Sequence, residues 1–365
     1  MSGQECLTDA LQPSPARTTD EEVGVPGALR AAAPAALLVA GLIVAGCSTV
    51  GGSANQQTIP PAEPAVAPPG GPAPAGTVTP LPAPATEVVV DARTRTVAVT
   101  LVDPPRLLLR TLDGTEAPRQ VPLPGPAAEL VLASDGGELL VPVTTPACLI
   151  RISLDGGAPH RSDLDGPARG AAVVGGITAV ALGDRLAVFD GNRPRAPIRG
   201  FSDAARLVPA GATTGTKVWV LDRARSAVSV VDLSSGEISP ELRAGNGAAD
   251  AVADRFGRLL VTDTRDGELL AFAGDPPMLR QRFPLSGAPY GVAYDARRDL
   301  AWVTLTGRDE VVGLSVAGGE PVVIHRFPTV HQPDAVAVDP ASGRVLVVSA
   351  SGMGLQMIDP ERVVQ

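Results

Sequence analysis

Seven polar residues stand where a repeated sequence pattern would bring them together. They are three acids, two arginines, a tyrosine and a further aspartate: Glu87, Glu129, Asp250, Arg169, Arg206, Tyr290 and Asp334. Clustered carboxylates could hold a hard cation such as Ca²⁺ with water ligands, or help to polarise a lactone or a similar substrate. The two arginines could instead neutralise that charge or bind an anionic ligand. In a third interpretation, these groups only hydrate the mouth of a channel.

Motifs of common enzyme classes are missing from the sequence. It contains no nucleophile elbow, phosphate loop, dinucleotide-binding glycine pattern or zinc-protease helix. Residues 263–268 lack the spacing of a calcium loop, and a hairpin explains them better. We expect His160, His325 and His331 in exposed loops, and Cys148, in an apolar strand, as a buried and inert thiol. No catalytic residue is assigned, and no metal site is predicted beyond the Ca²⁺ alternative.

Short strands must position the seven polar residues, because the composition excludes a mainly helical fold. The 365 residues include 40 glycines and 37 prolines, which would break nearly every helix. Asp-Gly pairs, a strong hairpin signal, separate many of the apolar runs. Aligned on units such as residues 216–238, equivalent positions fall at 87, 129, 170, 206, 250, 291 and 335, in steps of 42, 41, 36, 44, 41 and 44 residues. This period matches the blades of a β-propeller.

One group of segments resembles a known repeat family. Trp302-Val303-Thr304 and SAVSVVDLSSGEI (residues 226–238) resemble the YVTN-type repeat of YVTN- and NHL-like propellers, over about 280 residues in all. The resemblance implies an all-β fold, a seven-bladed β-propeller of four-stranded antiparallel blades, in which each first strand lines a central channel. It is poorest in residues 168–204. Trp219 and Trp302 are expected between blades. Because this repeat occurs in binding proteins and in enzymes, it implies no activity.

The ring of blades needs a strand that joins its two ends. Residues 77–91 read like residues 120–134, in which Val-Pro-Leu is the outer strand of a preceding blade. We therefore predict that residues 77–82 supply the outer strand of the last blade. The competing candidate is the end of the chain, residues 362–365.

The N-terminal region reads as an export signal. Residues 31–45 form an apolar stretch that ends in Val44-Ala45-Gly46-Cys47, which resembles the lipobox of bacterial lipoproteins. The resemblance implies a signal peptide over residues 1–46 and a lipid on Cys47. Residues 1–24 are too acidic for such a signal, so the true start is expected near Val25. A single lysine, Lys217, is typical of GC-rich coding, as in actinobacteria.

Residues 47–76 read as a lipidated cysteine followed by a linker. Residues 48–85 hold ten prolines and five glycines without any hydrophobic period. We predict a disordered, semi-rigid spacer that could extend to roughly 90 Å at about 3.1 Å per residue. The folded head would then span residues 77–365. A net charge of −9 makes nucleic acid an unlikely partner.

These observations predict a protein of the cell membrane, lipid-anchored on the extracytoplasmic face. The leading hypothesis is a monomeric, non-enzymatic scaffold that binds an envelope protein or a small molecule. The alternative is a metal-dependent, lactonase-like hydrolase with its site at the channel mouth. Neither the ligand nor the biological process follows from the sequence.

Overall fold

The computed structural model describes residues 57–114, 117–133, 136–211 and 215–362, and the predicted signal peptide and Cys47 lie outside these ranges. These ranges contain 28 β-strands joined by turns, which confirms the all-β prediction. Among the described residues, no helix is long and apolar enough to cross a membrane. All the strands belong to one compact unit, residues 54–365.

Five sheets are four-stranded antiparallel blades, as predicted for a propeller. The first two are β2 (Ala85–Asp91), β3 (Thr96–Leu101), β4 (Arg106–Thr111) and β5 (Arg119–Pro122), and β6 (Val131–Leu132), β7 (Glu138–Val143), β8 (Cys148–Ser153) and β9 (His160–Asp163). Two more are β18 (Ala248–Ala253), β19 (Leu259–Asp263), β20 (Glu268–Ala273) and β21 (Met278–Pro284), and β22 (Pro289–Asp295), β23 (Leu300–Leu305), β24 (Glu310–Ser315) and β25 (Val322–Pro328). The fifth joins β26 (Pro333–Val338), β27 (Val345–Ser349) and β28 (Leu355–Ile358) to β1 (Thr77–Thr79).

The remaining sheet has eight strands. They are β10 (Gly170–Val174), β11 (Ile177–Ala181), β12 (Gly183–Asp190), β13 (Arg193–Pro194), β14 (Ile198–Pro209), β15 (Lys217–Asp222), β16 (Ala227–Asp232) and β17 (Leu242–Arg243). The prediction of seven separate four-stranded blades is therefore wrong, since five such blades accompany one larger sheet. The cause is β14, a twelve-residue strand that pairs with both β12 and β15 and so leaves no break between them.

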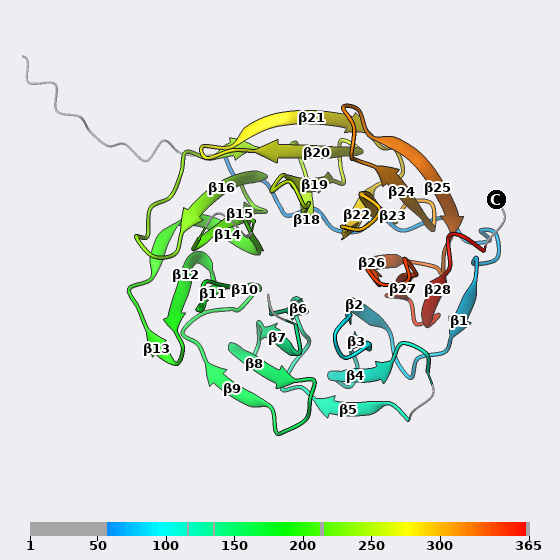
Figure 1. Ribbon diagram of the computed structural model, residues 1–365, viewed down its shortest axis with the longest axis horizontal. Coiled ribbons are helices and arrows are strands. Elements are labelled where there is room, and N and C mark those ends of the chain that lie inside the picture. The colour runs from blue at the N-terminus through cyan, green and yellow to red at the C-terminus, as the bar shows by residue number, and fades with distance from the viewer. Residues whose placement is uncertain (1–56, 115–116, 134–135, 212–214, 363–365) are drawn as a thin grey trace, which may run out of the picture. The chain divides into compact units, whose positions relative to one another are not determined.

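The sheets stand around a common centre (Figure 1). The first strands contact one another in the order β2, β6, β10, β14, β18, β22 and β26, and β26 contacts β2. Apolar side chains fill the spaces between neighbouring sheets. Trp219 packs between the eight-stranded sheet and β18–β21, and Trp302 packs against β26 and β27, as predicted for inter-blade residues.

A recurring aspartate explains why the first strand of a blade turns sharply into the second. Asp91, Asp254, Asp295 and Asp339 each end or follow a first strand and accept backbone N–H groups two to four residues further on. Such local bonds stabilise tight turns. These four aspartates are therefore turn residues, and none of them lines the central cavity.

The ring closes through the N-terminal side of the chain, as predicted. Strand β1 pairs with β28, with Thr77 opposite Met357 and Thr79 opposite Leu355. The buried Gln356 strengthens this junction, because its side-chain amide donates to the carbonyls of Ala75 and Pro328.

The predicted disordered linker is wrong for part of its length. Residues 59–67 lie against the propeller, with Ala62 only 1% and Ala67 only 4% exposed, whereas residues 68–73 are exposed. The sequence lacks a hydrophobic period here because the segment docks through backbone hydrogen bonds and small side chains. The linker prediction for residues 47–56 lies outside the described residues.

Candidate functional site

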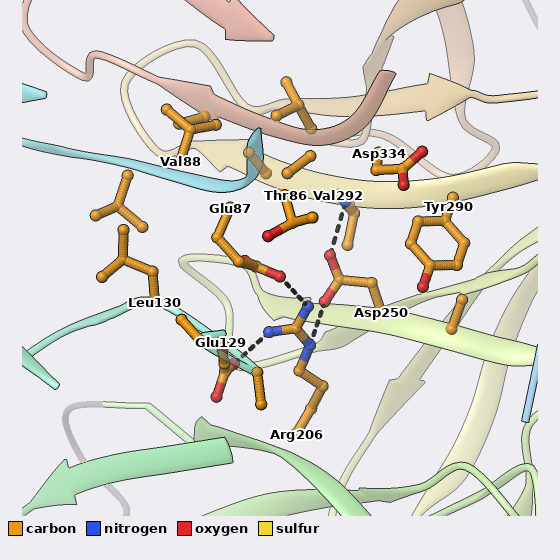
Figure 2. A pocket seen from close by; sticks show the side chains of 18 of the residues that line it. Thr86, Glu87, Val88, Glu129, Leu130, Arg206, Asp250, Tyr290, Val292 and Asp334 are labelled. Carbon is orange, nitrogen blue, oxygen red and sulfur yellow. Dashed lines mark hydrogen bonds and ion pairs between the residues drawn. The ribbon is translucent and has the colours of Figure 1, made fainter. Parts of the chain in front are cut away.

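Arg206 lies at the centre of the candidate site. Its guanidinium forms ion pairs with three carboxylates, at 2.7 Å to Glu129, 3.0 Å to Asp250 and 3.4 Å to Glu87 (Figure 2). These three acids come from the region before β6, from β18 and from β2, so the cluster draws on four separate parts of the ring. The arginine thus neutralises part of the cluster, which is one of the arrangements that the sequence left open.

The carboxylates also connect neighbouring first strands. Oε2 of Glu129 accepts the N–H of Ala171 at 3.0 Å, and Oδ2 of Asp250 accepts the N–H of Val292 at 3.0 Å. Each bond spans 42 residues, which is one repeat. A Cβ at Gly170 would stand 2.1 Å from the carbonyl oxygen of Ala205 and 2.8 Å from Oε2 of Glu129, so only glycine fits beside this contact.

A bulge at the start of the first strands turns these side chains towards the centre. The pairing register shifts next to Glu87, Arg206 and Asp250. In two of these strands a threonine of the second strand accepts the N–H of the bulged residue, Thr100 that of Glu87 at 3.0 Å and Thr262 that of Asp250 at 3.2 Å. Bulges re-aim side chains in this way near functional sites. These two threonines therefore help to hold Glu87 and Asp250 in position.

Burial controls the charges of the cluster. Desolvation raises the pKa of Glu87 to about 7, and the nearby Arg206 only partly opposes this shift. Burial also raises the pKa of Glu129. For Arg206, burial by itself would lower the pKa, but the charges of Asp250, Glu129 and Glu87 raise it well above its ordinary value. Arg206 is thus a permanent cation, while Glu87 changes its charge near neutral pH.

Asp334 and Tyr290 form a second group on the same cavity. Burial raises the pKa of Asp334 to about 6, and the charge of Glu63 adds to this effect while a hydrogen bond from Gln332 opposes it. The pKa of Tyr290 is also raised, mainly by burial. Among the described residues, neither Glu63 nor Asp334 has an ion-pair partner, whereas Arg169 is paired with Asp203 at 2.9 Å.

All seven predicted residues line one cavity of about 620 Å³. Valines complete one part of its wall, among them Val88, Val252, Val292 and Val336. That the seven residues converge is therefore an observation, and that they bind a ligand stays a prediction. The carboxylates lie inside the channel at low exposure, with Glu129 only 8% exposed, so they do more than hydrate its mouth.

Two cavity residues escaped the sequence analysis. Glu63 lies in the supposed linker, and Arg223 lies in the turn between β15 and β16. One signal was present, since Glu63 is the single charged residue in the proline-rich stretch 48–85. A spacer has no need of a lone acid at that position.

Two groups that were not predicted to form sites, the acids of residues 263–268 and the thiol of Cys148, have structural surroundings. Asp263, Asp266 and Glu268 bring carboxylate oxygens within 4.8 Å of one another, but Asp263 accepts the N–H of Asn246 at 2.8 Å and that of Asp266, as a hairpin turn requires. Cys148 is fully buried, as predicted, and burial raises the pKa of its thiol.

The histidines differ in part from expectation. His331 contacts Asp309 through Nδ1 at 2.6 Å, and the ring of His325 stacks on Trp302 at 5.5 Å. His160 is exposed, as predicted, but it begins strand β9 and does not lie in a loop. The three histidines do not join the cavity that the seven predicted residues line.

Comparisons with known proteins support the fold and leave the activity open. No protein-family model and no curated protein matches the chain. Among solved structures, hydrazine synthase of Kuenenia stuttgartiensis matches with a TM-score of 0.65 at 13% identity, over 78% of this chain and 97% of that chain. A catalytically inactive virginiamycin B lyase of Staphylococcus aureus, solved with quinupristin, gives 0.64 at 15% identity, over 77% and 97%. The β-propeller domain of Myceliophteria thermophila Cps50 (Swd1) gives 0.64 at 14% identity, over 78% and 99%. At such identities the likeness establishes a β-propeller and nothing further.

Proposed function

We propose that the chain is an extracytoplasmic bacterial lipoprotein, anchored through Cys47, whose propeller is a non-enzymatic binding head. The observation that carries the non-enzymatic assignment is the state of the central carboxylates. Glu87, Glu129 and Asp250 share one guanidinium, and Glu129 and Asp250 also accept backbone N–H groups. A metal ion would have to displace Arg206 to use all three acids, so the cluster is better suited to hold the blades and the cavity in shape.

The cavity favours ligands that carry a positive or a neutral polar group. Five acids and three arginines line it, and its volume of about 620 Å³ is in the usual range for small-molecule sites. Glu63 and Asp334 supply carboxylates without a cationic partner among the described residues. The valine wall would receive an apolar part of the ligand.

The hydrolase alternative keeps one supporting observation. A buried glutamate with a pKa of about 7 is a suitable general acid or base at neutral pH. Glu87 would have that role in a lactonase-like reaction. Burial is the main cause of the raised pKa and Arg206 opposes it, so a buried structural glutamate explains the shift equally well.

A thermal-shift experiment separates the two functions. We expect no rise in melting temperature with Ca²⁺, Mg²⁺, Mn²⁺ or Zn²⁺ relative to chelator, and no lactone hydrolysis. A panel of organic amines should instead stabilise the protein, and Glu63→Gln or Asp334→Asn should weaken that effect. Stabilisation by a metal ion that disappears in Glu87→Gln would favour the hydrolase.

The eight-stranded sheet also has a simple interpretation in terms of blades. We infer that it takes two blade positions, β10–β13 and β14–β17, which would restore the seven units of the repeat. Support comes from β14, which pairs with β12 through its first half and with β15 through its second half. Both β10 and β14 also belong to the closed series of first strands.

A further inference from the structure

A proline-rich segment lies across one face of the propeller. Residues 59–67, called the strap below, pass over the turn between β15 and β16, the turn between β19 and β20, the turn between β23 and β24, and the start of β26 (Figure 1, blue). This face is therefore already occupied by an extended peptide that belongs to the chain itself.

Side chains of the propeller bind the strap through its carbonyl groups. Arg265 donates to the carbonyls of Pro60 and Pro61 at 2.7 and 3.0 Å, and Arg223 donates to that of Ala62. Gln332 donates to the carbonyl of Ala65 at 2.9 Å. Because proline has no N–H, a proline-rich peptide offers mainly acceptors, and this face supplies matching donors.

The N–H groups of the strap also have partners on the body. Ile59 donates to the carbonyl of Ala224 at 2.7 Å, and Ala65 donates to the hydroxyl of Thr306 at 3.0 Å. The contacts thus follow the backbone of the strap on both its donor and its acceptor side. An extended chain of another protein would present the same groups.

The docked strap also requires small side chains at two of its positions. Ala62 and Ala67 are buried at 1% and 4% exposure, while Val66 between them points outward and is 74% exposed. Gly247 lies so close that a Cβ there would stand 3.2 Å from the Cβ of Ala62. Only a small side chain fits at these two positions, which lie five residues apart.

We propose that this face is a recognition surface for an extended, proline-rich peptide with small residues five positions apart, and that the strap is its resident occupant. The occupant in trans would be a proline-rich segment of another envelope protein. The inference goes beyond the proposed cavity function, because it uses the turns on the propeller face. Because Glu63 and Pro64 of the strap also line the cavity, the two functions are tested on different proteins, ligand binding on the wild type and Asp334→Asn, and peptide binding on Ala62→Trp.

The strap competes with any external peptide. A tethered segment acts at an effective concentration in the millimolar range, so the intact protein should bind a free peptide only weakly. Weakening the strap within the full-length chain should reveal the surface. Ala62→Trp removes the fit of the strap without changing any side chain of the propeller, and Val66→Trp is its matched control.

The test measures binding of a labelled peptide with the sequence of residues 57–68 (QTIPPAEPAVAP) by fluorescence anisotropy. We expect Ala62→Trp to bind it at least tenfold more tightly than the wild type, and Val66→Trp to behave as the wild type. Adding Arg265→Ala to Ala62→Trp should reduce the binding again. A peptide in which both small positions are Trp should not bind.

Amide hydrogen exchange of Ile59 and Ala65 in the same proteins reports whether the strap has been released. Fast exchange in Ala62→Trp without peptide binding would overturn the proposal, because the free surface would then recognise no peptide. Continued protection in Ala62→Trp would overturn it as well, since the small residue would not control docking. Release of the strap also withdraws Glu63 from the cavity, so amine stabilisation is compared only between the wild type and Asp334→Asn, in which the strap's own residues are unchanged.

Discussion

A single arginine determines what the central carboxylates can do. Without Arg206, the channel would hold three acids at low exposure, an arrangement that either protonates or recruits a cation. With it, Glu129 and Asp250 hold both the guanidinium and the next first strand. The carboxylates that the sequence suggested for metal binding or catalysis therefore serve mainly to hold the structure together.

Replacing Arg206 should therefore cost more than replacing an arginine of a surface ion pair. We expect Arg206→Gln to lower the free energy of unfolding by about 3–5 kcal/mol, because it leaves buried carboxylates without a partner. Arg95→Gln is the control, since Arg95 and its partner Asp113 are 50% and 51% exposed, and it should cost about 1 kcal/mol or less. Urea denaturation at pH 7.5 measures both. Equal costs would mean that the central ion pairs have no special weight.

The raised pKa of Glu87 makes stability depend on pH. The folded protein holds this proton up to about pH 7, whereas an ordinary glutamate releases it near 4.5. Its stabilising contribution is therefore complete below pH 4.5 and is lost as pH rises to 7, by up to roughly 3 kcal/mol at about 1.4 kcal/mol per pH unit. Glu87→Gln should flatten the decline in urea stability between pH 6 and 7.

Asp334 supplies an internal comparison, because its pKa is raised from 3.8 only to about 6. Asp334→Asn should remove the loss of urea stability that ends near pH 6. The loss of urea stability between pH 6 and 7 should stay unchanged. If the two variants had the same pH profile, the assignment of the two steps would be wrong.

Elements were more predictable than their assembly. Turn residues, strand periods and the closing strand β1 could be identified in the sequence, because each rests on local chemistry or on a repeat. The uninterrupted β14 could not, since nothing local marks where one sheet ends and the next begins. The strap was missed because it docks through its backbone, which leaves no apolar pattern. That the seven site residues lie close together could be predicted from the repeat period alone.

The bulges that aim the site residues give a prediction at the level of an element. Thr100→Val keeps the shape of the side chain and removes the acceptor for the N–H of Glu87, so it should cost about 1–3 kcal/mol of unfolding free energy. Thr111→Val is the control, because the Thr111 hydroxyl is buried and has no hydrogen-bond partner in the described part of the chain. This change should be neutral or stabilising. Calorimetric melting of both variants measures these costs. An unchanged stability of Thr100→Val would exclude the role of Thr100 in supporting Glu87.

Docking of the strap changes the geometry of the whole molecule at the membrane. If Cys47 carries the proposed lipid, only eleven residues separate it from Ile59, where the chain first contacts the propeller. Such a tether reaches at most about 40 Å, compared with roughly 100 Å for the twenty-nine residues up to Thr77. The proposed head would then stay within that distance of the bilayer.

Energy transfer in vesicles tests this arrangement, with a donor dye on Ser286→Cys and an acceptor dye in the lipid. The engineered thiol is exposed, while Cys148 is buried and should remain unlabelled. Transfer should be efficient for the otherwise wild-type protein and for Val66→Trp, because both keep the short tether. Ala62→Trp should lower the transfer, since a released strap lengthens the tether by eighteen residues. Cys47→Ala should abolish membrane association altogether. Unchanged transfer in Ala62→Trp would mean that the docked strap does not set the distance to the membrane, and retention of Cys47→Ala on vesicles would exclude the anchor.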